Sequence, residues 1–566
     1  MLRALRRFRL RSAQRQRRTR PTPLVDDGVG PIARLQRTPT LDGAAGGPGE
    51  TPRIGRRPPW RRLLLWGAGV LGVLVAGTAG VGAWLYTGAA TSTVGELDFS
   101  IPLRIPPLLE PDENRSGRKE FHLDLQRGRT ELLPGRRTET WGVNGSYLGP
   151  TLLAARGDEV VMRVDNRLGE KTTLHWHGMH LPAKADGNPH QPIADGDTWS
   201  PSWRIDQPAA TLWYHPHPHG RTADHVYRGI AGLFLVEDAR SDSNLPTDYG
   251  VDDIPLILQD KRFNDDGTLE LDAPLFSSVG QLGDTILVNG TYNPHVEVRD
   301  ELVRFRVLNA SNGRAYDIGF DDGRPFSLVA TDGGLLPSPH TTTSIQVSPG
   351  ERVEIVARFT AGERVVLRSN PPDLGLDYFQ NRFSGGDDHF DLLEVRAADE
   401  LIESSPLPEN FGGAAELPAP EDAIATRQFE LSGSSRINGR SMDPSRIDTV
   451  AAVGTTEIWE VTNGGGRPHS FHVHDVQFRV LDYAGASPPL PLQGAKDTVF
   501  LPPGTTARLA VRFEDYTDPL VPYMFHCHVL AHEDKGMMGQ FTVVDPGDVD
   551  SAPRRIQTHS GQYTDE

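Results

Sequence analysis

The sequence contains one cysteine, Cys527, and it lies between two histidines, His526 and His528. A lone cysteine excludes an intramolecular disulfide and a cysteine-rich zinc or iron–sulfur site within one chain. Most free cysteines are buried and unreactive, but His532 and Met537 follow this one at spacings of five and ten residues. One thiolate, imidazoles and a weak thioether are the ligands of a blue-copper electron-transfer site. His532 would supply one imidazole, and a second histidine must come from elsewhere in the chain.

A strand through Cys527 would bring its two neighbours to a second metal site. Side chains alternate between the faces of a strand, so His526 and His528 would share one face while Cys527 points to the other. The triplet could therefore contact two metal sites at once. A short covalent route would then connect the two sites.

The histidines of the whole chain also occur in pairs. The sequence has 19 histidines among 566 residues, a frequency at which chance predicts less than one His-x-His pair. Each such pair on a strand presents two imidazoles on one face, where both can bind the same metal site. One pair alone is more often solvated or structural, but several pairs together with the cysteine motif predict a metal cluster. The pairs are His175-Trp-His177, His215-Pro-His217, His217-Pro-His219, His472-Val-His474 and His526-Cys-His528.

Four motifs resemble, in the same order, the four copper-binding motifs of the multicopper oxidases. They occupy most of the chain after residue 95, and the resemblance is to bacterial three-domain members such as spore-coat laccases, bilirubin oxidases and periplasmic cuprous oxidases. The motifs are His175-Trp-His-Gly178, Trp213-Tyr-His-Pro-His217, His469-Ser-Phe-His-Val-His474 and His526-Cys-His-x3-His-x4-Met537.

The resemblance implies four copper ions as cofactors. A type 1 copper would be bound by His469, Cys527, His532 and an axial Met537, and a type 2 copper by His175 and His472. Two type 3 coppers would take the remaining ligands, which are His177, His215, His217, His474, His526 and His528. Further histidines would either support the ligands or be structural, namely His180, His190, His219 and His225.

Two acidic residues also match the family. Asp186 lies eleven residues after His175, and Glu533 directly follows His532. Most acids are exposed, but the resemblance implies that these two relay protons to oxygen. Reduction of O2 to water consumes protons in a buried place, so the chemistry needs such groups.

The N-terminal part of the chain differs from the rest. Residues 1–62 carry 16 arginines against 4 acids, a formal charge of +12, whereas the whole chain carries −17 and residues 63–566 therefore −29. Few apolar residues and many Arg, Pro, Gly and Thr predict a disordered cytoplasmic arm. A basic arm can also bind nucleic acid, but the segment that follows favours a membrane-related role, and we expect no nucleic-acid partner.

The segment 63–86 is 24 residues long and contains no charge. About 20 apolar residues suffice to span a bilayer, and the preceding arginines would stay cytoplasmic by the positive-inside rule. The segment is therefore either a transmembrane anchor or a cleaved signal of the twin-arginine type. We favour the anchor, because the apolar run exceeds a typical signal core and no Ala-x-Ala site follows it. In both cases the later domains would face outside the cytoplasm, anchored or exported.

Short alternating runs separated by Gly- and Pro-rich turns predict an all-β protein. One pattern occurs three times, at 157–166, 299–309 and 454–463, which predicts three similar sandwiches. The resemblance implies that these are cupredoxin-like Greek-key β-sandwiches. We place them at 95–240, 250–400 and 425–546, with a polar tail at 547–566. The His-x-His pairs lie in the first and third sandwiches, and the middle sandwich holds none. The metal cluster should therefore form between the first and the third sandwich.

These features predict a laccase-like oxidase that couples one-electron oxidation of phenols or aromatic amines to reduction of O2 to water. One alternative is a cuprous ion oxidase for copper tolerance. That class carries methionine-rich inserts, whereas this chain has seven methionines and offers Arg467 close before His469. A second alternative is a copper-free relative that acts in cell division, but such relatives have lost ligands and no ligand is lost here.

Overall fold

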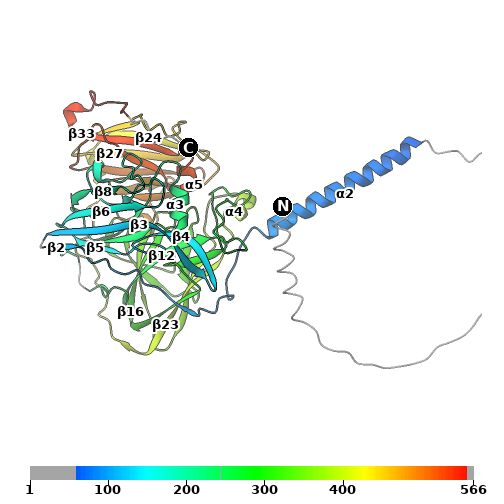
Figure 1. Ribbon diagram of the computed structural model, residues 1–566, viewed down its shortest axis with the longest axis horizontal. Helices are drawn as coiled ribbons and strands as arrows, with labels where there is room; N and C mark the ends of the chain where they lie inside the picture. The colour runs from blue at the N-terminus through cyan, green and yellow to red at the C-terminus, as the bar shows by residue number, and fades with distance from the viewer. Residues whose placement is uncertain (1–58, 116, 242–243, 558–566) are drawn as a thin grey trace, which may run out of the picture. The chain divides into compact units, whose positions relative to one another are not determined.

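The computed structural model describes residues 59–115, 117–241 and 244–557 (Figure 1). The chain divides into two compact units, Met1–Val75 and Ala76–Glu566. Most of the predicted disordered arm, residues 1–58, and the end of the predicted tail, residues 558–566, lie outside the described residues.

A long helix, α2 (Pro59–Thr87), covers the predicted apolar segment 63–86. Across the described residues, however, no helix was found that is long and apolar enough to cross a membrane. The anchor and the cleaved signal therefore both stay predictions. The end of α2 packs on α4 (Tyr378–Phe383), where the ring of Tyr86 lies 5.3 Å from that of Tyr378 and Arg382 donates a hydrogen bond to the Tyr86 carbonyl at 2.7 Å.

Within the described residues of the second unit, the strands form six sheets. Each sheet packs face to face with another around a shared apolar core. The predicted all-β fold of three sandwiches is confirmed.

The first sandwich pairs a sheet in the order β2-β3-β6-β8, to which β4 and β9 are added, with a sheet in the order β5-β11-β10-β7. Its strands are β2 (Glu113–Arg115), β3 (Arg118–Leu133), β4 (Arg136–Val143), β5 (Leu152–Ala155), β6 (Glu159–Arg167), β7 (His175–His177), β8 (Thr198–Trp199), β9 (Ser202–Arg204), β10 (Ala210–His215) and β11 (Gly232–Glu237). A short helix, α3 (Thr222–Arg228), lies between the last two strands.

The second sandwich pairs the orders β1-β15-β23-β22-β17-β20 and β14-β13-β12-β16-β21-β18-β19. Its strands are β1 (Ile101–Pro102), β12 (Asp253–Lys261), β13 (Thr285–Val288), β14 (Thr291–Tyr292), β15 (Pro294–Asp300), β16 (Leu302–Asn309), β17 (Tyr316–Phe320), β18 (Phe326–Thr331), β19 (Gly334–Thr342), β20 (Ser344–Val347), β21 (Arg352–Arg358), β22 (Arg364–Asn370) and β23 (Phe390–Ile402). Although β1 lies in the range expected for the first sandwich, it pairs with β15 of the second.

The third sandwich pairs the orders β25-β24-β27-β31-β29 and β26-β33-β32-β28-β30. Its strands are β24 (Ala423–Ser432), β25 (Arg436–Ile437), β26 (Thr449–Ala452), β27 (Thr455–Asn463), β28 (His469–Val473), β29 (Phe478–Tyr483), β30 (Thr498–Leu501), β31 (Thr506–Phe513), β32 (Tyr523–Cys527) and β33 (Met538–Val544). One turn of helix, α5 (Leu530–Glu533), follows β32.

The three copies of the sequence repeat become equivalent strands. β6, β16 and β27 each pair in parallel with an earlier strand of their own sandwich, namely β3, β12 and β24. The alternation of the repeat places one set of side chains in the core of each sandwich, as in the buried Val160, Met162 and Val164 of β6.

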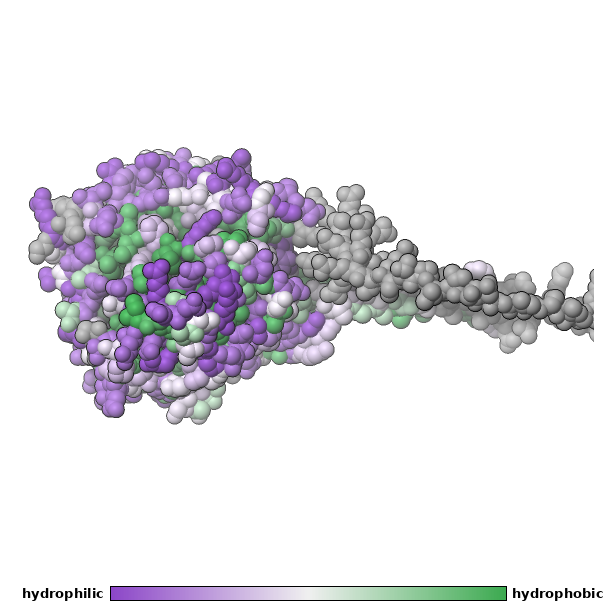
Figure 2. Space-filling view, turned by 90° about the horizontal axis from the view of Figure 1, so that it is seen from below, coloured by the Kyte–Doolittle hydropathy of each residue, from purple (hydrophilic) through white to green (hydrophobic). Residues whose placement is uncertain are grey.

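Hydrophilic side chains cover most of the face shown in Figure 2, and hydrophobic ones gather in small areas between them. Single exposed apolar side chains are normal on protein surfaces. Among the most exposed ones outside α2 are Leu275, Tyr378 and Leu520.

Candidate metal centre

Two pairs of neighbouring strands carry the histidine motifs. In the first sandwich β7 runs antiparallel to β10, so that His175 lies opposite His215. In the third, β28 runs antiparallel to β32, so that His472 lies opposite His526. Strand pairing therefore brings together His-x-His pairs that are far apart in the sequence.

Cys527, His469 and His532 meet at one buried point. The Sγ atom of Cys527 lies 3.4 Å from Nδ1 of His469 and 3.6 Å from Nδ1 of His532. Met537 is fully buried, and its backbone carbonyl accepts a hydrogen bond from the Cys527 amide at 3.1 Å. The Nε2 atom of His532 donates to the Ser278 carbonyl at 2.9 Å, which leaves Nδ1 free to bind a metal. Three of the four predicted type 1 ligands, His469, Cys527 and His532, therefore share one site.

Burial sets the protonation of these side chains. It raises the pKa of the Cys527 thiol to about 12 and lowers the pKa of His469 to about 3, with the positive charge of Arg467 as a further cause. A neutral imidazole is ready to bind a metal, whereas the thiol must lose its proton when a metal binds.

The other histidines form a second buried cluster between the first and third sandwiches. The Nε2 atoms of His217 and His474 each lie 3.2 Å from Nε2 of His526. The rings of His177 and His472 are stacked with centroids 3.7 Å apart. Sets of three histidines have ligand atoms within 4.8 Å of one another, for example His175 with His177 and His215. The structure thus places the predicted type 2 and type 3 ligands together, where the resemblance expects them.

Several ring nitrogens in the cluster fit the role of metal ligands. In His175, His215 and His472 the Nδ1 atom donates to a backbone carbonyl at 2.9 Å. The Nε2 atoms of these three are buried and have no hydrogen-bond partner among the described residues. A buried polar atom without a partner costs about 1–3 kcal/mol, and a bound metal ion would remove that cost. Nδ1 of His177 and both ring nitrogens of His528 are likewise buried without a hydrogen-bond partner among the described residues.

Most imidazoles of the cluster are held neutral. Burial is the largest cause that lowers the pKa values of His177 and His472, and the charges of neighbouring histidines lower them further. The pKa of His217 falls to about 3, although Glu533 acts in the opposite direction. The pKa values of His215, His474, His526 and His528 lie well below the ordinary value.

Asp186 and Glu533 lie on two sides of the cluster, and both are buried. Asp186 accepts a hydrogen bond from Nδ1 of His474 at 2.8 Å, and the carboxylate oxygens of Glu533 lie 3.4 Å from Nδ1 of His217 and 3.3 Å from Nδ1 of His526. Burial alone would raise the pKa of Asp186, but His474 and His175 hold it well below the ordinary value. For Glu533 burial dominates and raises the pKa.

Sequence reasoning missed Asp497, which is fully buried and accepts a hydrogen bond from Nε2 of His177 at 3.0 Å. Most acids are exposed, and nothing in the local pattern around Asp497 distinguishes it from a surface carboxylate. Two histidines without a predicted ligand role pair with acids. His180 pairs with Asp475 at 2.8 Å, and His225 with Glu170 at 2.9 Å.

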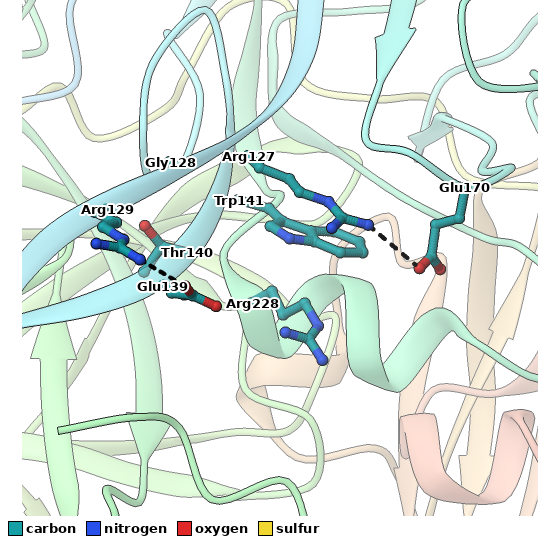
Figure 3. A pocket seen from close by; sticks show the side chains of 8 residues that line it. All are labelled: Arg127, Gly128, Arg129, Glu139, Thr140, Trp141, Glu170 and Arg228. Atoms are coloured by element: carbon teal, nitrogen blue, oxygen red, sulfur yellow. Dashed lines mark hydrogen bonds and ion pairs between the residues drawn. The ribbon is translucent and has the colours of Figure 1, made fainter. Parts of the chain in front are cut away.

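A polar surface pocket in the first sandwich is lined by none of the predicted copper ligands (Figure 3). Trp141 lies between two guanidinium groups, those of Arg127 and Arg228, at 5.5 and 5.1 Å from the ring centroid. Its arginines are paired with acids, as in the 2.9 Å contact between Arg129 and Glu139. The pocket is therefore separate from the histidine sites.

Known proteins resemble this chain over most of its length. The multicopper oxidase family matches residues 124–241, 258–365 and 416–547. Multicopper oxidase mco of Staphylococcus haemolyticus is 36% identical over 454 residues, which cover 78% of this chain and 92% of the relative. Cell division protein FtsP of Edwardsiella tarda is 40% identical over 448 residues, with 78% and 92% covered. The crystal structure of laccase from Pediococcus acidilactici Pa5930 is 35% identical, with 78% and 94% covered and a TM-score of 0.71.

Proposed function

The chain belongs to the multicopper oxidases and is therefore a copper-dependent oxidase, and on that premise we propose that it is a laccase-like enzyme. It would oxidise phenols or aromatic amines one electron at a time and reduce O2 to water. The observation that carries this proposal is the position of Cys527. Its Sγ lies 3.4 Å from His469 Nδ1 on one side, while its neighbour His526 contacts His217 and His474 at 3.2 Å on the other.

Four copper ions fit the two sites. His469, Cys527, His532 and Met537 would hold a type 1 copper. His175 and His472 would hold a type 2 copper, and the type 3 pair would take His177, His215, His217, His474, His526 and His528. When bound, copper supplies the one-electron redox changes and the reduction of O2. The peptide chain from Cys527 to its two histidine neighbours covalently links the sites.

The acids would supply the protons. Reduction of one O2 to two waters takes four electrons and four protons, which must reach a site that these side chains shield from water. Asp186 is held ionised beside His474, where its negative charge favours a proton that enters the cluster. Burial raises the pKa of Glu533, so this carboxyl binds a proton more readily than an exposed glutamate does, beside His217 and His526.

The charge near the type 1 site favours an organic substrate over Cu(I). Arg467 lies close enough to lower the pKa of His469, and its guanidinium repels a cation and does not bind one. Thioether sulfur would favour Cu(I), but no methionine precedes His469 in the stretch 463–468. A cuprous ion oxidase is therefore the second candidate, with lower expected kcat/KM for Cu(I) than for a phenol.

The resemblance to a cell division protein raises the possibility of a copper-free role. All the positions that would bind copper hold His, Cys or Met, and most of these histidines, together with Cys527, lie in groups that could hold a metal ion. This favours the oxidase. We also propose that the folded unit lies outside the cytoplasm, anchored through 63–86. Membrane sedimentation of the full chain, compared with a chain that starts at Gly88, tests this localisation.

Copper loading and one substitution test the proposal. The loaded protein should be intensely blue and should consume O2 with a phenol and an aromatic amine faster than with a stabilised Cu(I) complex. Cys527→Ser should lose the colour and the oxidase activity while the fold survives, as checked by circular dichroism. A colourless wild type, or a blue Cys527→Ser variant, would refute the type 1 assignment. A clear preference for Cu(I) would instead favour the second candidate.

A further inference from the structure

Asp497 contacts two predicted ligands from different sandwiches. Its carboxylate accepts a hydrogen bond from Nε2 of His177 at 3.0 Å, and its backbone carbonyl accepts one from Nδ1 of His472 at 2.9 Å. Each contact occupies one ring nitrogen, and the other nitrogen, buried and without a partner among the described residues, would be available to a metal ion. Such partners determine the orientation of metal-binding histidines.

Arg352, at the start of β21 in the second sandwich, holds the Asp497 carboxylate. Its Nη1 and Nη2 atoms donate to the two carboxylate oxygens at 2.8 and 2.6 Å. The other donors go to backbone carbonyls of Thr211 at 3.0 Å, Gly350 at 3.0 Å and Asp332 at 2.9 Å. All five N–H groups of the guanidinium are thus satisfied. Thr211 is in the first sandwich and Asp497 is in the third. The side chain of Arg352, which itself belongs to the second sandwich, therefore contacts both of the other sandwiches.

These charges belong to a larger buried group. Lys496 lies 2.9 Å from Asp332 and 2.8 Å from Glu351, and both acids are buried. Buried ion pairs add little net stability, and apolar replacements are often as stable. Stability alone therefore does not account for this group. Burial alone would raise the pKa of Asp497. The positive charge of Arg352 outweighs burial and holds the pKa of Asp497 well below the ordinary value.

Two glycines, Gly178 and Gly350, leave room for the side chains around Arg352 and Asp497. A Cβ atom at Gly178, directly after His177, would lie 2.6 Å from Nη2 of Arg352 and 2.7 Å from Oδ2 of Asp497. A Cβ atom at Gly350 would lie 2.9 Å from the ring of His528. Both glycines have positive φ, +85° and +89°, at which other residues are strained. The glycine of the His-Trp-His-Gly motif is thus explained by the contact between Arg352 and Asp497.

We propose that Arg352 and Asp497 form a clamp through which the second sandwich, which holds no predicted ligand, positions His177 and His472. Both are positioning residues. Asp497 does not itself bind metal in this proposal, because both its oxygens are held by the guanidinium. The inference rests on the proposed function, since it concerns the geometry of the three-copper site.

Three single variants of the full chain and one double variant test the clamp. Arg352→Lys keeps the charge but loses the planar fork, and Asp497→Asn loses the carboxylate. Arg314→Lys is the matched control: Arg314 is a buried arginine of the same sandwich that pairs with Asp388 at 2.6 Å and Asp260 at 2.9 Å and contacts no predicted ligand. Copper-free protein of each variant is titrated with copper against a chelator. The type 2 signal is followed by electron paramagnetic resonance, and the type 1 and type 3 sites by absorption.

We expect Arg352→Lys and Asp497→Asn to lower copper affinity at the three-copper site by about 10- to 100-fold and to change the type 2 signal, while the blue colour stays. The double variant should lose no more than Asp497→Asn alone, because Arg352 acts through Asp497. Wild-type spectra in both single variants, or an equal loss in Arg314→Lys, would overturn the clamp. A wild type that itself lacks the type 2 and type 3 signals would refute the proposed function instead.

Discussion

Asp186 and Glu533 are both buried beside the histidine cluster, but their pKa values are shifted in opposite directions. Two acids with separated pKa values can divide proton acceptance and proton donation between them. The difference comes from their contacts, since Asp186 lies against His474 and His175 whereas for Glu533 the effect of burial is larger.

Asp186→Asn and Glu533→Gln should keep the blue colour and slow reoxidation of the reduced protein by O2. The expected loss is about 10²-fold or more, the lower end of what a positioned proton donor contributes. Stopped-flow absorption measures it. Asp195→Asn, an exposed acid of the same loop as Asp186, should react at the wild-type rate. Unchanged reoxidation in both test variants would make these acids structural.

Lys261 illustrates the cost of a buried charge at a single residue. Burial lowers its pKa to about 7 from an ordinary value of 10.5, although Asp260 acts in the opposite direction. Between pH 7 and pH 10.5 the unfolded chain binds the Lys261 proton more strongly than the folded chain does, so the free energy of unfolding rises as pH increases across this range. Below pH 7 Lys261 is charged in both states, and the cost of burying its charge is fully present. Each pKa unit corresponds to about 1.4 kcal/mol, and the ring of Tyr227 4.2 Å away offsets part of the cost.

Lys261→Met should therefore raise Tm at pH 7, and the gain should shrink as pH approaches 10. Thermal unfolding of the copper-free protein at several pH values measures this. Lys496→Met is the control, because burial there is outweighed by Asp332 and Glu351, which raise the pKa of Lys496. That variant should lower Tm, since it leaves two buried acids without their partner. A gain from Lys261→Met that does not change with pH would contradict the explanation.

At the scale of elements, the segment 262–284 between β12 and β13 closes over the predicted type 1 site. Val279 and Leu282 join the core of the third sandwich, and the Ser278 carbonyl holds His532. The second sandwich thus contacts both predicted copper sites without supplying a predicted ligand to either one. It contacts the predicted type 1 site through this segment and the other site through Arg352.

Gly280→Ala should disturb the type 1 site. Gly280 has φ +81°, and a Cβ atom there would lie 2.3 Å from Cβ of Ala531, the residue before His532. We expect a stability loss of about 1–3 kcal/mol together with a shift of the blue absorption band. Gly267→Ala is the control, because φ is +86° but the Cβ would face Arg136 at 3.3 Å. It should cost stability without changing the colour, and an unshifted band in Gly280→Ala would refute the prediction.

At the scale of the whole molecule, the sandwiches are joined by the cluster. His177 and His217 come from the first sandwich and His472 and His526 from the third, and these side chains interleave. A metal that binds only the folded form stabilises it, by about 2.7 kcal/mol at a hundredfold excess over Kd. Copper should therefore hold the first and third sandwiches together.

Removal of copper should lower Tm by several degrees, as calorimetry would show, and copper should restore it. Cys527→Ser loses only the type 1 site, so its loaded form should unfold between the stripped and the loaded wild type. Equal Tm values for stripped and loaded wild type would mean that the sandwiches associate without help from the metal.

The sequence by itself determined the ligand types, their order and the β-architecture. Spacing within a few residues decides which side chains share a face, so the pairs around Trp176 and Cys527 were readable without coordinates. The threefold repeat predicted three sandwiches, and their sheets form the pairs expected. The membrane role of 63–86 remains a prediction.

Only the tertiary structure decided which distant residues support the ligands. His177 and Asp497 are 320 residues apart, and His474 and Asp186 are 288 apart. Arg352 begins a strand, β21, and nothing in the sequence around it indicates that its side chain reaches another sandwich. The physical reason is that burial and charge pairing depend on which surfaces pack together, whereas local spacing records only the faces of a single strand.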